Sequence, residues 1–180
     1  MNYKYRDFVV KNKIEITEDS KKGFRYLLKI PFTNDPKNSA LIILKNPSVA
    51  TGSESDHTIN RICDYCQKKG FDEVYVANLF AYRAQDAKVM VATAGEKGEN
   101  YIIGELNDKY ITNVKDKVKK IILAWGIHPS KYKTQYSARI KEVMSILSNN
   151  DVYHVGKLCG KEKYPLHAQP WGYNMIMIKY

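Results

Sequence analysis

The chain has 180 residues, which is enough for one domain with its own hydrophobic core. Its 29 Lys and Arg residues exceed its 19 Asp and Glu residues, giving a formal net charge of +10. No run approaches the roughly 20 apolar residues of a membrane-spanning helix, and Met1–Arg6 lacks the apolar stretch of a signal peptide. We therefore expect one cytoplasmic domain over residues 1–180, without a membrane partner. The charge suits a nucleic-acid partner, although it also fits a role in solubility alone.

Short apolar segments predict the strands of a central sheet. Arg25–Pro31 is typical of a strand that ends in a turn. Four further segments are apolar along most of their length, as strands buried on both faces of a parallel sheet are. They are Ala40–Leu44, Glu73–Leu79, Lys120–Trp125 and Asp151–Val155.

Helical periodicity occurs between these strands. It predicts helices over Thr58–Lys69, which Gly70 ends, over Glu99–Val118 and over Tyr136–Leu147. Alternation of strands and helices favours a parallel sheet with helices on both faces. The expected fold is an α/β protein, a three-layer α/β/α sandwich on a small, mainly parallel four-stranded central sheet.

Cys63 and Cys66 form a C-x-x-C motif, which in principle suits a metal or a redox site. With Ile59 and Ile62, however, they have the i, i+3, i+4, i+7 spacing of one helical face. Cys159 is the third cysteine, so a four-cysteine metal site is excluded. We expect the pair to be buried in a helix, and we expect no metal and no cofactor.

Polar, turn-rich segments follow the predicted strands, and functional residues of parallel sheets lie just beyond the carboxyl ends of strands. Each of these segments also has a simpler interpretation as a turn or a strand cap. Asp56-His57 likewise places a carboxylate beside an imidazole, but Asp56 is more simply the N-cap of the helix that follows. The segments are Asn46-Pro47-Ser48, Asn78-Leu79-Phe80-Ala81-Tyr82-Arg83-Ala84, Trp125-Gly126 and His167-Ala168-Gln169-Pro170-Trp171.

The first three of these segments together resemble an uncharacterised bacterial and phage domain family that is often carried on mobile elements. The order of all four is more distantly similar to the uracil-DNA glycosylase superfamily. That superfamily has an Asp-Pro or Asn-Pro after its first core strand, an Asn that reads uracil, and a late loop with the catalytic His. The resemblance implies an α/β/α fold and a DNA-repair hydrolase.

Carried over residue by residue, the resemblance implies catalytic roles for Asn46 and His167. Asn78 would read the base, with Pro47 and Ser48 beside it. An amide carries a donor and an acceptor side by side, which matches the edge of uracil. His167 would donate to the base oxygen on which negative charge develops. The most active members have Asp at the position of Asn46, so we expect modest activity.

Basic and aromatic residues are expected to hold DNA, which has to present an unstacked base. Trp171 would act as a wedge between bases, although a core position suits it equally well. The DNA-binding residues we expect are Arg83, Lys131, Lys133, Lys161, Lys163 and Trp171.

The sequence therefore predicts a DNA glycosylase that hydrolyses the N-glycosidic bond of uracil, or of a related base, in single-stranded or uracil-containing DNA. An alternative is a catalytically weak, glycosylase-like module of a mobile element that binds DNA or protein, such as a proteinaceous glycosylase inhibitor. A small-molecule nucleoside or nucleotide enzyme is a third possibility, which the charge of +10 disfavours.

Overall fold

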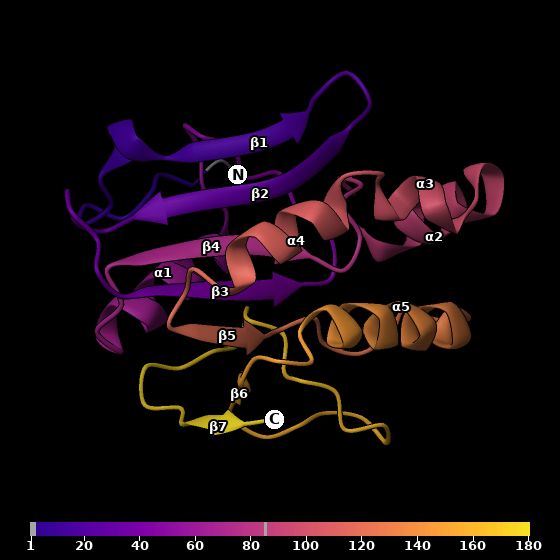
Figure 1. Ribbon diagram of the computed structural model, residues 1–180. Coiled ribbons are helices and arrows are strands. Elements are labelled where there is room, and N and C mark those ends of the chain that lie inside the picture. Colours follow the sequence, from indigo (N-terminus) through magenta and orange to yellow (C-terminus); the bar gives the residue numbers. More distant parts are fainter. Residues whose placement is uncertain (1–2, 85) are drawn as a thin grey trace.

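The computed structural model describes residues 3–84 and 86–180, and its centre is one twisted, mixed β-sheet (Figure 1). The strands of the described chain lie in the order β1-β2-β4-β3-β5-β6-β7. Their bounds are β1 Glu15–Asp19, β2 Phe24–Pro31, β3 Ser39–Leu44, β4 Glu73–Asn78, β5 Lys120–Leu123, β6 Val152–Val155 and β7 Met177–Lys179.

The four central strands β4, β3, β5 and β6 pair in parallel, as the apolar segments predict. The expected limit of four strands is wrong, because the sheet has seven strands in the part of the chain described here. β2 pairs with β4, β1 with β2, and β7 with β6, all antiparallel. β1 and β7 are short edge strands in which no side chain is buried, unlike the apolar central strands that the sequence indicates.

Helices lie on both faces of the sheet. α1 lies behind the strands in Figure 1, whereas α4 lies in front of them. Their bounds are α1 His57–Lys68, α2 Ala87–Lys97, α3 Glu99–Ile103, α4 Asn107–Lys115 and α5 Lys133–Ile146, with a 3-10 turn at Lys11–Lys13. No helix in residues 3–84 and 86–180 is both long enough and apolar enough to cross a bilayer.

The expected helices correspond to α1 and α5, but the single helix Glu99–Val118 is wrong. Gly104 interrupts it with a φ of 83°, between α3 and α4. A Cβ at this glycine would lie 3.1 Å from both the Ala81 Cβ and a ring carbon of Tyr26. The break therefore comes from close packing against the sheet, which helical periodicity does not reveal.

Each face of the sheet has its own hydrophobic core. On the α1 side, Ile42 and Val76 pack against Ile59, Cys63 and Cys66 of α1. All three cysteines are free, and Cys63 and Cys66 are fully buried, which confirms their place on the inner face of a helix. Burial raises the pKa of both thiols well above the ordinary value. The other face holds Trp125, Tyr136 and the inner sides of the remaining helices.

Candidate functional site at the strand ends

The carboxyl ends of the parallel strands point towards α2, α3 and α5 in Figure 1. Backbone hydrogen bonds hold the loops beyond these strands together. The Phe80 N–H donates to the Lys45 carbonyl over 3.0 Å, and the Gly126 N–H donates to the Pro165 carbonyl over 3.1 Å. The segments that follow β3, β4 and β5 therefore meet at one edge of the sheet, together with the late loop that carries His167.

Asn78 is the last residue of β4 and lies beside Leu44 of β3. Val74 and Val76 pack in the α1-side core, and strand alternation places Asn78 on the same side. The side chain is 0% exposed, and within the described chain neither its Oδ1 nor its Nδ2 has a hydrogen-bond partner. A buried amide without partners costs stability, so it is a candidate for ligand recognition.

His167 packs against Gly126. A Cβ on this glycine would lie 3.1 Å from the His167 Cβ, so the glycine, with a φ of 69°, permits the contact. The Gln169 N–H donates to His167 Nδ1 over 3.2 Å. Burial lowers the pKa of His167, the Lys45 ammonium lowers it further, and Asp56 raises it. At neutral pH the lowered pKa favours the uncharged imidazole, and because Nδ1 accepts a hydrogen bond, the ring proton is assigned to Nε2, which can serve as a donor.

Asp56 is the N-cap of α1, as expected. One carboxylate oxygen accepts from the Ile59 N–H over 2.8 Å, and the other accepts from the Ser48 hydroxyl. Arg25 donates to the Ala50 carbonyl, and Ser48 of the same loop donates to Asp56, so one loop joins these side chains on the α1 side of the strand ends. We call Ser48, Asp56, Asn78, His167 and Arg25 the strand-end site.

Asn46 holds two loops together. Its Nδ2 donates to the Ala84 carbonyl over 2.9 Å and to the Pro47 carbonyl over 3.2 Å. Pro47 is buried beneath this loop. An aspartate at position 46 would place a carboxylate oxygen against both carbonyl oxygens, which would repel it. The structure of the loops therefore favours asparagine at this position. Its catalytic role stays a prediction.

Arg25 is a site residue that no sequence motif indicates. Thr17 pairs with Leu27 and Glu18 with Arg25, so Tyr26 is an extra residue that forms a bulge in β2. Tyr26 stacks on Tyr110 of α4, and Arg25 points to the opposite side, towards Ala50. Without the bulge, strand alternation would place Arg25 on the same side of the sheet as Leu27, away from the α1-side core.

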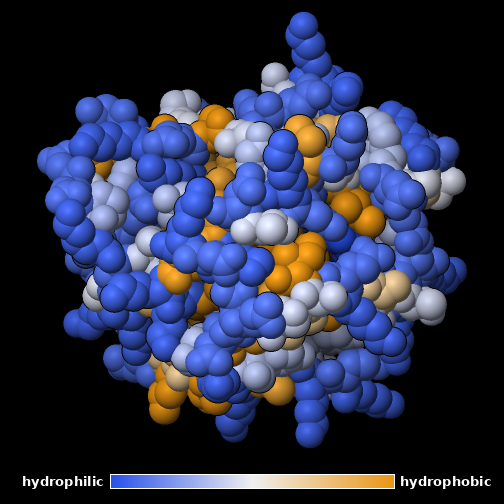
Figure 2. Space-filling model, viewed as in Figure 1, coloured by the Kyte–Doolittle hydropathy of each residue, from blue (hydrophilic) through white to orange (hydrophobic). Residues whose placement is uncertain are grey.

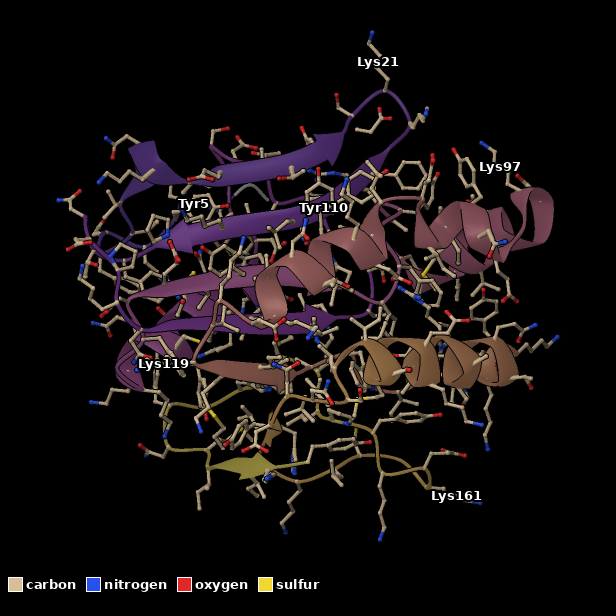
Figure 3. All side chains as sticks on the ribbon, viewed as in Figure 1. Tyr5, Lys21, Lys97, Tyr110, Lys119 and Lys161 are labelled. Atoms are coloured by element: carbon tan, nitrogen blue, oxygen red, sulfur yellow. The ribbon has the colours of Figure 1, made fainter. Side chains whose placement is uncertain are left out.

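The expected DNA-binding lysines gather beyond the start of α5. Lys133 forms an ion pair with Glu162, which brings the 161–163 turn next to the loop that contains Lys131. Lys131, Lys133, Lys161 and Lys163 are all exposed. Figure 3 shows Lys161 projecting outward from its loop, and Figure 2 shows that the face in view is largely hydrophilic. DNA binding by this group stays a prediction.

Two other expected DNA-binding residues are engaged inside the protein. Arg83 donates to the Ser48 and Ala50 carbonyls and forms a 2.5 Å ion pair with Glu18. Trp171 is 1% exposed and packs on Tyr65, with 5.0 Å between ring centroids. Trp171 therefore occupies the core position that we expected as the alternative to a wedge, while Gln169 and Pro170 just before it are exposed.

In residues 3–84 and 86–180, no three His, Cys, Asp or Glu side chains are grouped as metal ligands. The polar groups of the strand-end site are instead hydrogen-bond donors and acceptors together with one guanidinium. Such a site can bind and polarise an organic substrate.

The lowered pKa of His167 predicts a pH-dependent stability. The unfolded chain takes up a proton at the ordinary value of 6.5, whereas the folded protein does so only at lower pH. The free energy of unfolding should therefore fall as the pH is lowered through 6.5, and less so in His167→Gln. Urea unfolding at about pH 7.5, 6.5 and 5.5 measures this. His154, whose pKa burial also lowers, should retain part of the slope; an unchanged slope in the variant would contradict the prediction.

The fold and these residues define a mixed α/β protein with a polar site at the carboxyl ends of its parallel strands. A family model described as "Protein of unknown function (DUF1643)" matches residues 25–168, and the chain belongs to this family. This confirms the expectation of an uncharacterised domain family. No curated protein and no solved structure matches the chain.

Proposed function

We propose that the protein is a DNA glycosylase of the uracil-excising type, which hydrolyses the N-glycosidic bond of uracil or a related base. The observation that carries this proposal is that two side chains lie at the same end of the sheet. One is the buried Asn78 amide, which has no hydrogen-bond partner among the described residues, and the other is the neutral imidazole of His167. Asn78 ends β4, and His167 packs beside Gly126, beyond β5. β3 lies between these two strands, so they are two strand spacings apart, roughly 10 Å.

Asn78 would recognise the base. Its amide offers one acceptor and two donors, which match the N–H and carbonyl groups of a pyrimidine edge. A base in this position has left its stack, as it must in any enzyme that acts on the glycosidic bond. The bound edge would also provide the hydrogen bonds that the buried amide lacks in the described chain.

His167 would stabilise the leaving base. As the bond between the base nitrogen and the sugar breaks, its electron pair leaves with the base and negative charge spreads onto the base oxygens. The oxygen of a water molecule then bonds to the sugar carbon, and the proton that the water loses neutralises the departed base. A neutral imidazole can donate a hydrogen bond from its Nε2–H to such an oxygen and keep its proton. Asn46 would help to orient the water through its Oδ1, because its Nδ2 is held by the Pro47 and Ala84 carbonyls.

The second candidate is a glycosylase-like module that binds DNA or protein without efficient catalysis. The hydrogen bonds of Asn46 favour it, because they give this residue a structural role where the most active enzymes use a carboxylate. The lysines near α5 serve DNA binding in both candidates. The two differ only in whether bound DNA loses a base.

The test is excision by the purified protein. We expect uracil-containing oligonucleotides, single-stranded or mispaired, to acquire abasic sites slowly, detected by alkaline cleavage and unaffected by a chelator. Thymine-mismatch and hydroxymethyluracil oligonucleotides serve as comparison substrates. If no abasic sites form with protein in excess over DNA, glycosylase function is excluded, and binding of the same oligonucleotides would then favour the module.

A further inference from the structure

Two arginines in the described part of the chain are almost fully buried, and they differ in their partners. Arg139 of α5 is 2% exposed, and its donors reach the Leu79 carbonyl, Asp108 and Glu142. Arg25 is 0% exposed and donates through Nη1 to the Ala50 carbonyl over 2.9 Å. Its Nε and Nη2 have no hydrogen-bond partner among residues 3–84 and 86–180.

The surroundings of Arg25 do not neutralise it directly. Arg83 donates to the same Ala50 carbonyl over 3.0 Å, so two guanidinium groups lie side by side. Glu18 pairs with Arg83, and both carboxylate oxygens of Asp56 accept other hydrogen bonds. Burial, and secondly Arg83, lower the pKa of Arg25 to about 10. A buried cation with unused donors is costly, and such a cost is typical of functional positions.

The Nε–Nη2 edge of an arginine presents two parallel N–H groups, which match two oxygens of one anionic group. We propose that this edge of Arg25 binds a phosphate group of the substrate. The inference rests on the proposed function, and it specifies the substrate class as nucleotides, free or within DNA, rather than nucleosides.

The position of Arg25 suits this role. It belongs to β2, which lies directly beside β4, the strand that carries Asn78. Its side chain extends towards Ala50, so one nucleotide could place its base at Asn78 and its phosphate at Arg25. Arg25 is 0% exposed and is held by the Ala50 carbonyl of the loop 48–55, so this loop has to shift for a phosphate to enter. Its tip is a turn in which the Glu54 N–H donates to the Thr51 hydroxyl, followed by Ser55 and the N-cap Asp56.

The test is binding to the full-length protein, measured by calorimetry with deoxyuridine, deoxyuridine 5′-monophosphate and inorganic phosphate. We expect the monophosphate to bind roughly tenfold or more tightly than the nucleoside, because hydrogen bonds between charged groups are strong. Arg25→Lys keeps the cation but loses the paired donors, so it should remove most of this difference. Arg139→Lys is the matched control at a buried arginine, and it should retain the difference.

Phosphate alone should raise the melting temperature of the wild type and of Arg139→Lys, but not that of Arg25→Lys. If the affinity for a uracil-containing oligonucleotide depends on Arg25 but the affinity for the mononucleotide does not, the phosphate bound by Arg25 belongs to the DNA backbone. The proposal would be overturned if the wild type bound deoxyuridine, deoxyuridine 5′-monophosphate and the oligonucleotide with equal affinity. This outcome does not depend on whether the Arg25 variant folds. Because no excision is measured, a failed glycosylase assay leaves this result intact.

Discussion

Replacing His167 with alanine is expected to slow uracil excision by roughly 10²–10³-fold, the usual loss when one donor to a developing negative charge is removed. The variant should fold normally, because the imidazole is only half-buried and accepts one hydrogen bond, from the Gln169 N–H. Single-turnover excision of a uracil oligonucleotide measures the effect. The matched control is His128→Ala, since His128 lies in the loop after β5 and its Nδ1 contacts only its neighbour's carbonyl among the hydrogen bonds of the described chain.

Asn78→Leu tests the base-recognition residue of the same site. We expect excision to fall by a similar factor, while the free energy of unfolding stays the same or rises. Leucine has a similar shape, and it removes a buried amide that has no hydrogen-bond partner in the described residues. Loss of activity without loss of stability distinguishes a recognition residue from a structural one. Parent-like excision by both His167→Ala and Asn78→Leu would show that the site is placed wrongly.

Truncation of Trp171 should have the largest effect on stability. The side chain is 1% exposed and packs on Tyr65 and the surrounding α1-side core. Trp171→Ala is therefore expected to lower the free energy of unfolding by about 3–5 kcal/mol, the range for large aromatic residues in cores. Urea unfolding monitored by circular dichroism measures this change.

Trp171→Phe is the control for this prediction. It keeps a ring against Tyr65 and removes an indole N–H that has no partner in the part of the chain that the structure describes, so the loss should be much smaller. A DNA wedge would behave differently. If Trp171→Ala kept its full stability but lost affinity for DNA, the core assignment would be wrong.

The sequence by itself determined the central parallel strands, α1 and its cap, and most of the residues at the strand ends. These features depend on local patterns: apolar runs such as Ala40–Leu44, the helical spacing of Cys63 and Cys66, and an N-cap acid at Asp56. Because parallel strands end at one edge, their polar loops could be expected to meet there.

Only the tertiary structure decided which side chains face the site. A bulge turned Arg25 towards Ala50, and close packing at Gly104 divided the expected long helix. The late loop buried Trp171 while it brought His167 against Gly126. Each of these outcomes depends on contacts between residues far apart in the chain. Local periodicity carries no information about such contacts, so the buried donors that distinguish Arg25 from Arg139 became visible only in the folded protein.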